Sequence, residues 1–353
     1  MKQLLSARIL ALLAFCAIFA QCNVQSVTIN TLKPAKITFP SYVNTLVLVD
    51  RTTYARRGDE VIHDLFSGGI PGEDRGAVQS AIASLNSNLQ LSPRFKVLVA
   101  TEEFKGNSLT TSFPDAMPWE EIQSICDEYK CEGVVAFEMF GSNFSINKEE
   151  RKVQVQQKQS DGKYVNVDGI EHWVHGTARV RMGIRLYEPK AKTIIDQQLF
   201  TQSHTWDAKG NNFRDAEANL ISSSEATRFV ADNAAKSYAY KIAPMPIKLS
   251  RQFYTSSKKV PAMEQGSKLS NVNDWNGAVT TWQNALTDAT PKKDAGQLCI
   301  DIAVGYEVQG NLELAKKWAD RAYVDYNNKN GKYYSQTLAN RMADEQKVDE
   351  QMK

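Results

Sequence analysis

Residues 178–186 alternate between apolar and polar side chains, and this pattern constrains the fold more than any other stretch of the chain. The apolar positions are Ala178, Val180, Met182, Ile184 and Leu186, and the opposite face carries Thr177, Arg179, Arg181 and Arg185. A period of two predicts a strand with one buried and one wet face. The turn at residues 188–192 and the run at 193–206 extend it into a long antiparallel ribbon. The arginines are interpreted as a solvated face that discourages edge pairing, with an anion site as the alternative.

Strands and helices alternate before this ribbon. Residues 45–50, 95–100 and 133–140 are short apolar runs typical of buried strands, and helices are predicted over 76–91 and after Pro118. This order predicts crossover connections and a partly parallel sheet. One long helix over residues 213–242 is expected to cover the sheet, and Pro244 ends it. The predicted class is α+β, with a mixed sheet, packed helices and a long antiparallel ribbon in residues 41–258.

Two related segments follow. Ala278 and Ala315 lie 37 positions apart, as do Ala285 and Ala322. In each segment, a turn that contains Asp or Asn precedes the first alanine, and a tryptophan lies between the two alanines. These residues resemble tetratricopeptide repeats. The resemblance implies a small all-α repeat region over residues 259–328, and residues 329–353 are expected to form a capping helix and tail.

The repeat resemblance also implies a concave partner-binding surface. Its predicted residues are Met263, Ser267, Gln297, Ile300, Val304, Glu307 and Val308. The alternative is that these side chains pack against the α+β domain and make the repeats a buttress.

The N-terminus has the pattern of an export signal. Lys2 and Arg8 precede an unbroken apolar run at residues 9–20, which is shorter than the roughly 20 residues that span a bilayer. We expect residues 1–21 to be a signal peptide and Cys22 to be lipidated, with residues 22–40 forming an entry strand and linker. Cleavage after Ala20 is the alternative and leaves a soluble protein that begins at Gln21.

This organisation resembles a family of uncharacterised Bacteroidetes lipoproteins that have an α+β domain and tetratricopeptide-like repeats. The resemblance covers nearly all of the mature chain and includes the segments at residues 32–37, 243–244 and 251–254. Gln21 departs from it, because lipoprotein signal peptidase usually accepts a smaller residue there. Residues 23–26 lack acidic side chains, so the resemblance implies an outer-membrane lipoprotein facing the periplasm; a soluble periplasmic or secreted protein is the alternative.

The sequence shows little sign of catalysis. The net charge of +2 argues against binding nucleic acid, and no nucleophile elbow, metalloprotease helix or cofactor motif is present. Cys126 and Cys131 are interpreted as buried thiols, with a disulfide as the alternative, and their spacing does not suit zinc. We expect a non-enzymatic adaptor that binds an envelope protein, without cofactor or metal. The alternative is a ligand-binding or hydrolytic α+β domain with a pocket at the C-terminal ends of strands 45–50, 95–100 and 133–140.

Overall fold

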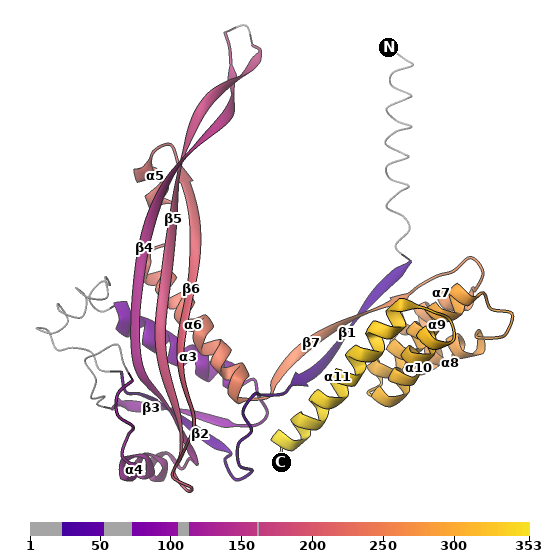
Figure 1. Ribbon diagram of the computed structural model, residues 1–353, viewed down its shortest axis with the longest axis horizontal. Coiled ribbons are helices and arrows are strands. Elements are labelled where there is room, and N and C mark those ends of the chain that lie inside the picture. The colour runs from indigo at the N-terminus through magenta and orange to yellow at the C-terminus, as the bar shows by residue number, and fades with distance from the viewer. Residues whose placement is uncertain (1–22, 53–72, 105–112, 161) are drawn as a thin grey trace, which may run out of the picture. The chain divides into compact units, whose positions relative to one another are not determined.

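The computed structural model describes residues 23–52, 73–104, 113–160 and 162–353, which divide into two compact units (Figure 1). The α+β unit comprises Ala35–Met245 with Gln351–Lys353, and the helical unit comprises the described residues up to Pro34 with Pro246–Glu350. Cys22 and the signal peptide predicted over residues 1–21 lie outside the described residues. The predicted α+β class is confirmed, and an all-α region follows it in the chain.

The α+β unit contains a five-stranded mixed sheet with strand order β3-β2-β4-β5-β6. Its strands are β2 (Thr45–Asp50), β3 (Lys96–Glu103), β4 (Gly133–Lys158), β5 (Tyr164–Glu188) and β6 (Thr193–Gly210). β2 runs parallel to β3 and to β4, as the alternation of strands and helices predicts, and β4, β5 and β6 are antiparallel. The apolar run of β2 is buried because both faces of the sheet are covered there.

Helices cover the sheet at its parallel end. α3 (Glu73–Leu89) and α6 (Ser223–Ile242) pack on one face, where the apolar positions of residues 178–186 join their core. The Ser80 hydroxyl of α3 donates to Asp232 of α6 at 2.7 Å and joins the two helices. On the other face, α4 (Trp119–Tyr129) packs through Ile122 and Ile125. The period-two face of β5 is therefore buried as predicted.

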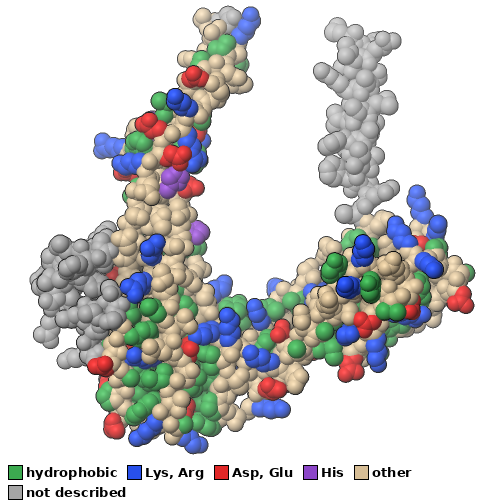
Figure 2. Space-filling view, viewed as in Figure 1, with side chains coloured by type: hydrophobic (Ala, Val, Ile, Leu, Met, Phe, Trp, Pro, Cys, Tyr) green, Lys and Arg blue, Asp and Glu red, His purple; other side chains and the backbone are tan. Residues whose placement is uncertain are grey.

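β4 and β5 form a ribbon that continues beyond the third strand. β6 pairs with β5 only as far as His172, whereas β4 and β5 remain paired up to Lys158 and Tyr164. In Figure 2, side chains of both charges and histidine lie along this ribbon, and hydrophobic side chains gather toward the end of the sheet near α4. Among the described residues, the outer part of the ribbon has only these two strands, and most of its side chains are exposed.

The covering helix predicted over residues 213–242 is two helices, α5 (Phe213–Ala218) and α6. The Ser222 hydroxyl accepts the Glu225 N–H at 3.3 Å, and the same hydroxyl donates to the Glu225 carboxylate at 2.7 Å. A serine followed three positions later by a glutamate is a capping box, which begins a new helix. The sequence therefore contained a signal for a new helix after Ser222, and the prediction of one helix is wrong.

The predicted solvated face holds for part of its length. Arg179 is exposed and Arg181 half-buried, but only 6% of Arg185 is exposed. Arg185 donates to the Pro114 carbonyl and to the Gln197 amide, each at 2.7 Å. The solvated-face prediction is wrong for Arg185, because the segment before α4 covers its end of the strand.

In its described residues, the helical unit combines a two-stranded sheet with five helices. The strands are β1 (Val24–Lys33) and β7 (Met245–Tyr254), and the helices are α7 (Ala262–Asn271), α8 (Trp275–Asn284), α9 (Lys292–Val308), α10 (Leu312–Val324) and α11 (Lys329–Gln351). Phe253 of β7 packs on α8 with ring centroids 5.7 Å from Trp275 and 6.0 Å from Trp282. Residues 246–258, which the sequence analysis placed with the α+β domain, thus belong to the helical unit.

The helix pairs α7–α8 and α9–α10 share one kind of turn. Asn273 and Gly310, 37 positions apart, both adopt positive φ, and the next residue in each turn caps the following helix. Asp274 accepts the Gly277 N–H at 2.9 Å, and Asn311 accepts the Leu314 N–H at 3.0 Å. Ala278, Ala315 and Ala322 are fully buried, and Ala285 is partly buried.

We predict that Gly266→Ala destabilises the helical unit. A Cβ at Gly266 would lie 2.2 Å from Trp282 Nε1, and Trp282 is fully buried and cannot yield. Alanine gains roughly 1 kcal/mol of helix propensity over glycine, but overpacking costs typically about 1–3 kcal/mol. Thermal and urea unfolding of the variant measure the net loss.

Gly141→Ala is the matched control, because no atom lies within 4 Å of its added Cβ. We expect its free energy of unfolding to stay within about 0.5 kcal/mol of the parent. A higher unfolding midpoint for Gly266→Ala would show that propensity outweighs the contact with Trp282.

Candidate functional site

A buried carboxylate joins the elements of the helical unit. Glu307 of α9 is fully buried and accepts hydrogen bonds from three side chains. Arg251 of β7 donates from Nε at 2.7 Å and from Nη2 at 2.9 Å, in a bidentate pair. From α11, the Tyr334 hydroxyl donates at 2.5 Å and Arg341 Nη1 at 2.6 Å. One strand and two helices are therefore fixed to each other at a single group.

The charges of this network determine the protonation of Glu307. Burial alone would raise the pKa of the carboxyl, but the hydrogen bonds from Arg251, Tyr334 and Arg341 outweigh it and hold the pKa below its usual value. Burial together with the neighbouring carboxylate raises the pKa of the Tyr334 phenol, so this hydroxyl stays protonated as a donor. Arg341 also pairs with Glu345 at 3.2 Å.

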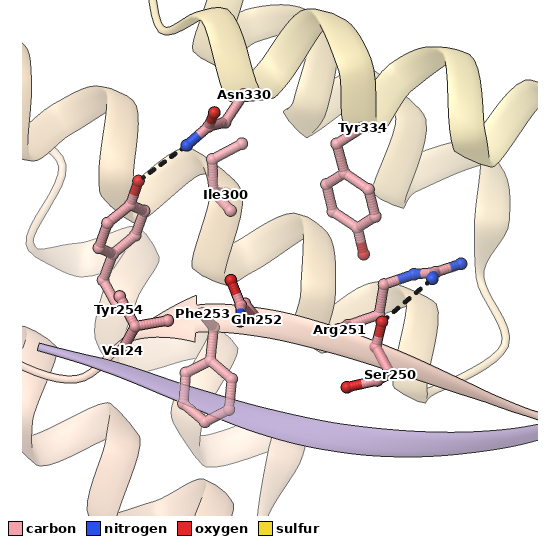
Figure 3. A pocket seen from close by; sticks show the side chains of 9 residues that line it. All are labelled: Val24, Ser250, Arg251, Gln252, Phe253, Tyr254, Ile300, Asn330 and Tyr334. Carbon is pink, nitrogen blue, oxygen red and sulfur yellow. Dashed lines mark hydrogen bonds between the residues drawn. The ribbon is translucent and has the colours of Figure 1, made fainter. Parts of the chain in front are cut away.

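A half-open groove with a volume of about 590 Å³ lies beside this network. It is lined by Val24, Ser250, Arg251, Gln252, Phe253, Tyr254, Ile300, Asn330 and Tyr334. Figure 3 shows the strand residues along one side, with Ile300, Asn330 and Tyr334 on the side of the helices. Aromatic and aliphatic surfaces with a few amides are typical of a site that accepts side chains of another molecule.

Tyr254 closes one end of the groove through two contacts. Its hydroxyl accepts from Asn330 Nδ2 at 3.2 Å, and its backbone N–H donates to Asp301 Oδ1 at 2.6 Å. Asp301 is fully buried, and burial raises the pKa of its carboxyl well above the usual value despite the bond from Tyr254. Its Oδ2 finds no hydrogen-bond partner among the residues that the structure describes.

The residues predicted for a concave partner surface lie mostly in the interior. Met263, Ser267, Ile300, Val304 and Glu307 are buried, and Gln297 and Val308 are half-buried. α9 is central, since one side joins the core with α8 and β7 and another joins α10 and α11. Five of the seven side chains are therefore not exposed, and of the seven only Ile300 lines the groove.

The other groove residues were not predicted from the sequence. Arg251, Gln252 and Tyr254 follow one another on a strand that was assigned to the other domain, and Asn330 lies in the first turn of the predicted capping helix. The alternation of apolar and polar residues in 247–250, directly before this stretch, was the available signal. It predicts an edge strand, but the partner helices come from positions 300, 330 and 334.

A second buried charge cluster lies where the alternative prediction placed a ligand pocket, at the C-terminal end of β2 and around Glu138 of β4. Glu138 pairs with Arg51 at 2.6 Å and with Arg185 at 3.6 Å, and it accepts the Tyr187 hydroxyl at 2.5 Å. All four side chains are buried. Burial, followed by the bond to Glu138, raises the pKa of Tyr187 to about 12. Among the described residues, these four buried side chains occupy the space next to the end of β2.

Cys126 and Cys131 meet at the end of α4. Both are buried free thiols, and the Cys131 thiol donates to Cys126 Sγ at 2.9 Å. The bond from Cys131 and burial raise the pKa of the Cys126 thiol, so it is not an activated nucleophile. Cys299 is also a buried free thiol, whose pKa burial raises to about 12.

His172 and His175 point to opposite sides of β5. His175 lies on the open face between Asp207 at 2.6 Å and Glu149 at 3.0 Å, and these carboxylates raise its pKa. His172 packs on Phe213 with ring centroids 4.8 Å apart. In the described part of the chain, no three His, Cys, Asp or Glu side chains are arranged to hold a metal ion. None of the described helices has the length and apolar character to cross a membrane.

Fold and site together define a two-unit protein with an α+β unit and a grooved helical unit. By sequence, the chain belongs to the family described as "Domain of unknown function (DUF8603)", whose model matches residues 43–254, more than half of the chain. A second model, "Domain of unknown function (DUF6340)", matches residues 264–344 in the helical unit. No curated protein sequence matches this chain.

Solved structures show only distant similarity. The PelC dodecamer from Paraburkholderia phytofirmans is 10% identical, with 62% of this chain and 98% of that chain covered and a TM-score of 0.23. A putative neuraminyllactose-binding hemagglutinin homolog from Helicobacter pylori is 16% identical, with 59% and 87% covered and a TM-score of 0.26. Scores this low transfer neither fold nor function to this chain.

We predict that Glu307→Gln destabilises the helical unit strongly and in a pH-dependent way. The variant leaves Arg251 and Arg341 without their shared counter-charge, a change that costs about 3–5 kcal/mol in buried pairs. The folded pKa of Glu307 lies below the unfolded value of about 4.3, so its contribution is present above that pH and is lost as the pH falls through the folded pKa. Urea unfolding at pH 7, 5 and 3 measures the difference.

Glu350→Gln, at an exposed carboxylate of α11, is the control and should change stability by no more than about 0.5 kcal/mol at any of these pH values. A gap between parent and Glu307→Gln that stays constant down to pH 3 would contradict the ionised network.

Proposed function

We propose that this protein is an exported, lipid-anchored envelope protein whose helical unit binds another protein. The observation that carries the binding role is the groove between β7 and helices α9 and α11. Phe253, Tyr254, Ile300 and Tyr334 give it apolar and phenolic walls, and Gln252 and Asn330 add exposed amides. The network around Glu307 holds the walls in place, so the site is formed before a partner arrives.

The anchor rests on the N-terminal sequence. A basic start, an apolar run too short to span a bilayer and Cys22 two positions after its end support lipidation and an outer-membrane position. Residues 23–26 carry no acidic side chain, which favours the periplasmic side. Two or three acyl chains would anchor the protein stably, whereas one chain binds only marginally. Anchoring also raises the effective concentration of membrane partners.

The helix pairs support the proposed kind of module. The turns after α7 and α9, with buried alanines 37 positions apart, favour a tetratricopeptide-like unit, and the whole organisation favours membership of the Bacteroidetes lipoprotein family that it resembles. In this interpretation the partner contacts the groove at the sheet rather than the buried face of α9.

The anchor predicts that the N-terminal peptide from the membrane fraction begins at Cys22 and carries a diacyl or triacyl adduct. Intact-mass spectrometry of this peptide is the measurement. Cys22→Ala should move the protein to the soluble fraction without changing its thermal unfolding. A free or cyclised Gln21 at the N-terminus would contradict the anchor.

The groove predicts that Asn330→Trp weakens partner binding at least about tenfold, because an indole at this exposed position would occupy the space that the partner needs. A photoreactive amino acid at Gln252 in living cells identifies the partner by mass spectrometry of the adduct. Binding of the purified partner to the full chain is then measured by titration.

Gln336→Trp is the matched control, since Gln336 is exposed on the same helix and does not line the groove. It should leave both affinity and stability unchanged. Equal affinities of the parent and Asn330→Trp would refute binding in the groove.

A further inference from the structure

The free edge of β7 runs along the groove. Figure 3 shows β7 between β1 and the groove side chains Ile300 and Tyr334. The Thr255 N–H donates to the Asn23 carbonyl at 2.9 Å, so the end of β7 lies beside the start of β1 and the strands are antiparallel. In such a ladder, alternate residues direct both backbone groups to the partner strand, and the residues between them direct both groups away. Residues 255, 253 and 251 therefore bond to β1, and residues 254, 252 and 250 face the groove.

Two of these three residues already have an outward backbone group bonded to a side chain of the same protein. The Tyr254 N–H donates to Asp301, which agrees with the assigned direction. The Ser250 carbonyl accepts from Arg251 Nη1 at 3.3 Å. For Gln252, neither backbone group makes a hydrogen bond with a described residue outside the two-stranded sheet. Gln252 is therefore an open backbone position between two closed ones.

We propose that this edge binds an extended segment of the partner protein, which joins β7 as a short third strand opposite Gln252. This inference rests on the proposed function and names the form of the partner. The segment would lie about 4.8 Å from β7 and exchange two backbone hydrogen bonds with Gln252. The contacts of Asp301 and Arg251 limit the pairing to a few residues.

The same geometry defines the side chains of the segment. The residue opposite Gln252 shares its face of the sheet, and the residues before and after it point to the other face. That face carries Arg251 and Phe253, whose contacts are with the helices. The groove there presents Ile300 and Tyr334, so the two flanking residues of the segment carry apolar or aromatic side chains.

Hydrogen exchange of the free full-length protein tests the edge directly. In the parent chain, the amides of Ser250 and Gln252 should exchange fast, and those of Arg251 and Phe253 should be protected by β1. Protection of all four amides would show that the edge is already occupied and would overturn the proposal.

Binding is tested with linear peptides selected from a displayed random library on the full-length protein in detergent. Gln252→Pro removes the outward N–H and spares every bond to β1, and proline is tolerated on an edge strand when its N–H faces away from the partner. Gln252→Ala keeps the backbone and removes the side chain. We expect Gln252→Pro to weaken the selected peptides at least about tenfold and Gln252→Ala to bind within about twofold of the parent.

The variants separate failure of this inference from failure of the proposed function. Peptides that lose affinity for Asn330→Trp but bind Gln252→Pro as well as the parent would occupy the groove without strand pairing, and the inference would fail alone. A library that yields no peptide sensitive to Asn330→Trp would count against the groove itself. N-methylation of the peptide backbone opposite Gln252 should reproduce the loss seen with Gln252→Pro.

Discussion

The helical unit depends on the ionised carboxylate of Glu307. Two guanidinium groups approach it within 3 Å, and neither could lie in this position without a counter-charge. Because Arg251 belongs to β7 and Arg341 to α11, the pairing fixes a strand and a helix against α9. The groove is the space that remains between these fixed elements, and its shape follows from a charge requirement.

Both units use the same chemical arrangement around a buried glutamate. In the helical unit, Glu307 has two arginines and a tyrosine as partners, and in the α+β unit Glu138 has Arg51, Arg185 and Tyr187. The register of β4 shifts between Phe137 and Met139, at Glu138 itself. A bulge of this kind re-aims a side chain, here into a covered layer. Buried charges therefore connect elements in both units where apolar packing would not select a single register.

The sequence predicted the periodic strands and helices well, but it did not predict which segments pack over them. The alternation over residues 178–186 predicted the buried face of β5, but nothing in it distinguished Arg181 from Arg185, since burial of Arg185 depends on a segment some seventy residues earlier. Glu307 appeared as a surface residue by its position in a repeat. Its burial requires Arg251 and Arg341, and a one-dimensional pattern does not show that three distant positions meet. The groove is composed of such distant positions.

The open position at Gln252 is more informative than an exposed edge alone. An exposed edge strand can pair with another strand. Here the Tyr254 N–H donates to the fully buried Asp301, and the Ser250 carbonyl accepts from Arg251, whose guanidinium also binds Glu307. A chain that only protected its edge would have closed the central position as well. Pairing at one residue adds few hydrogen bonds, each worth about 1 kcal/mol net, so affinity has to come from side chains in the groove. Such an interaction is weak in free solution, and a membrane anchor that raises the effective concentration would make it sufficient.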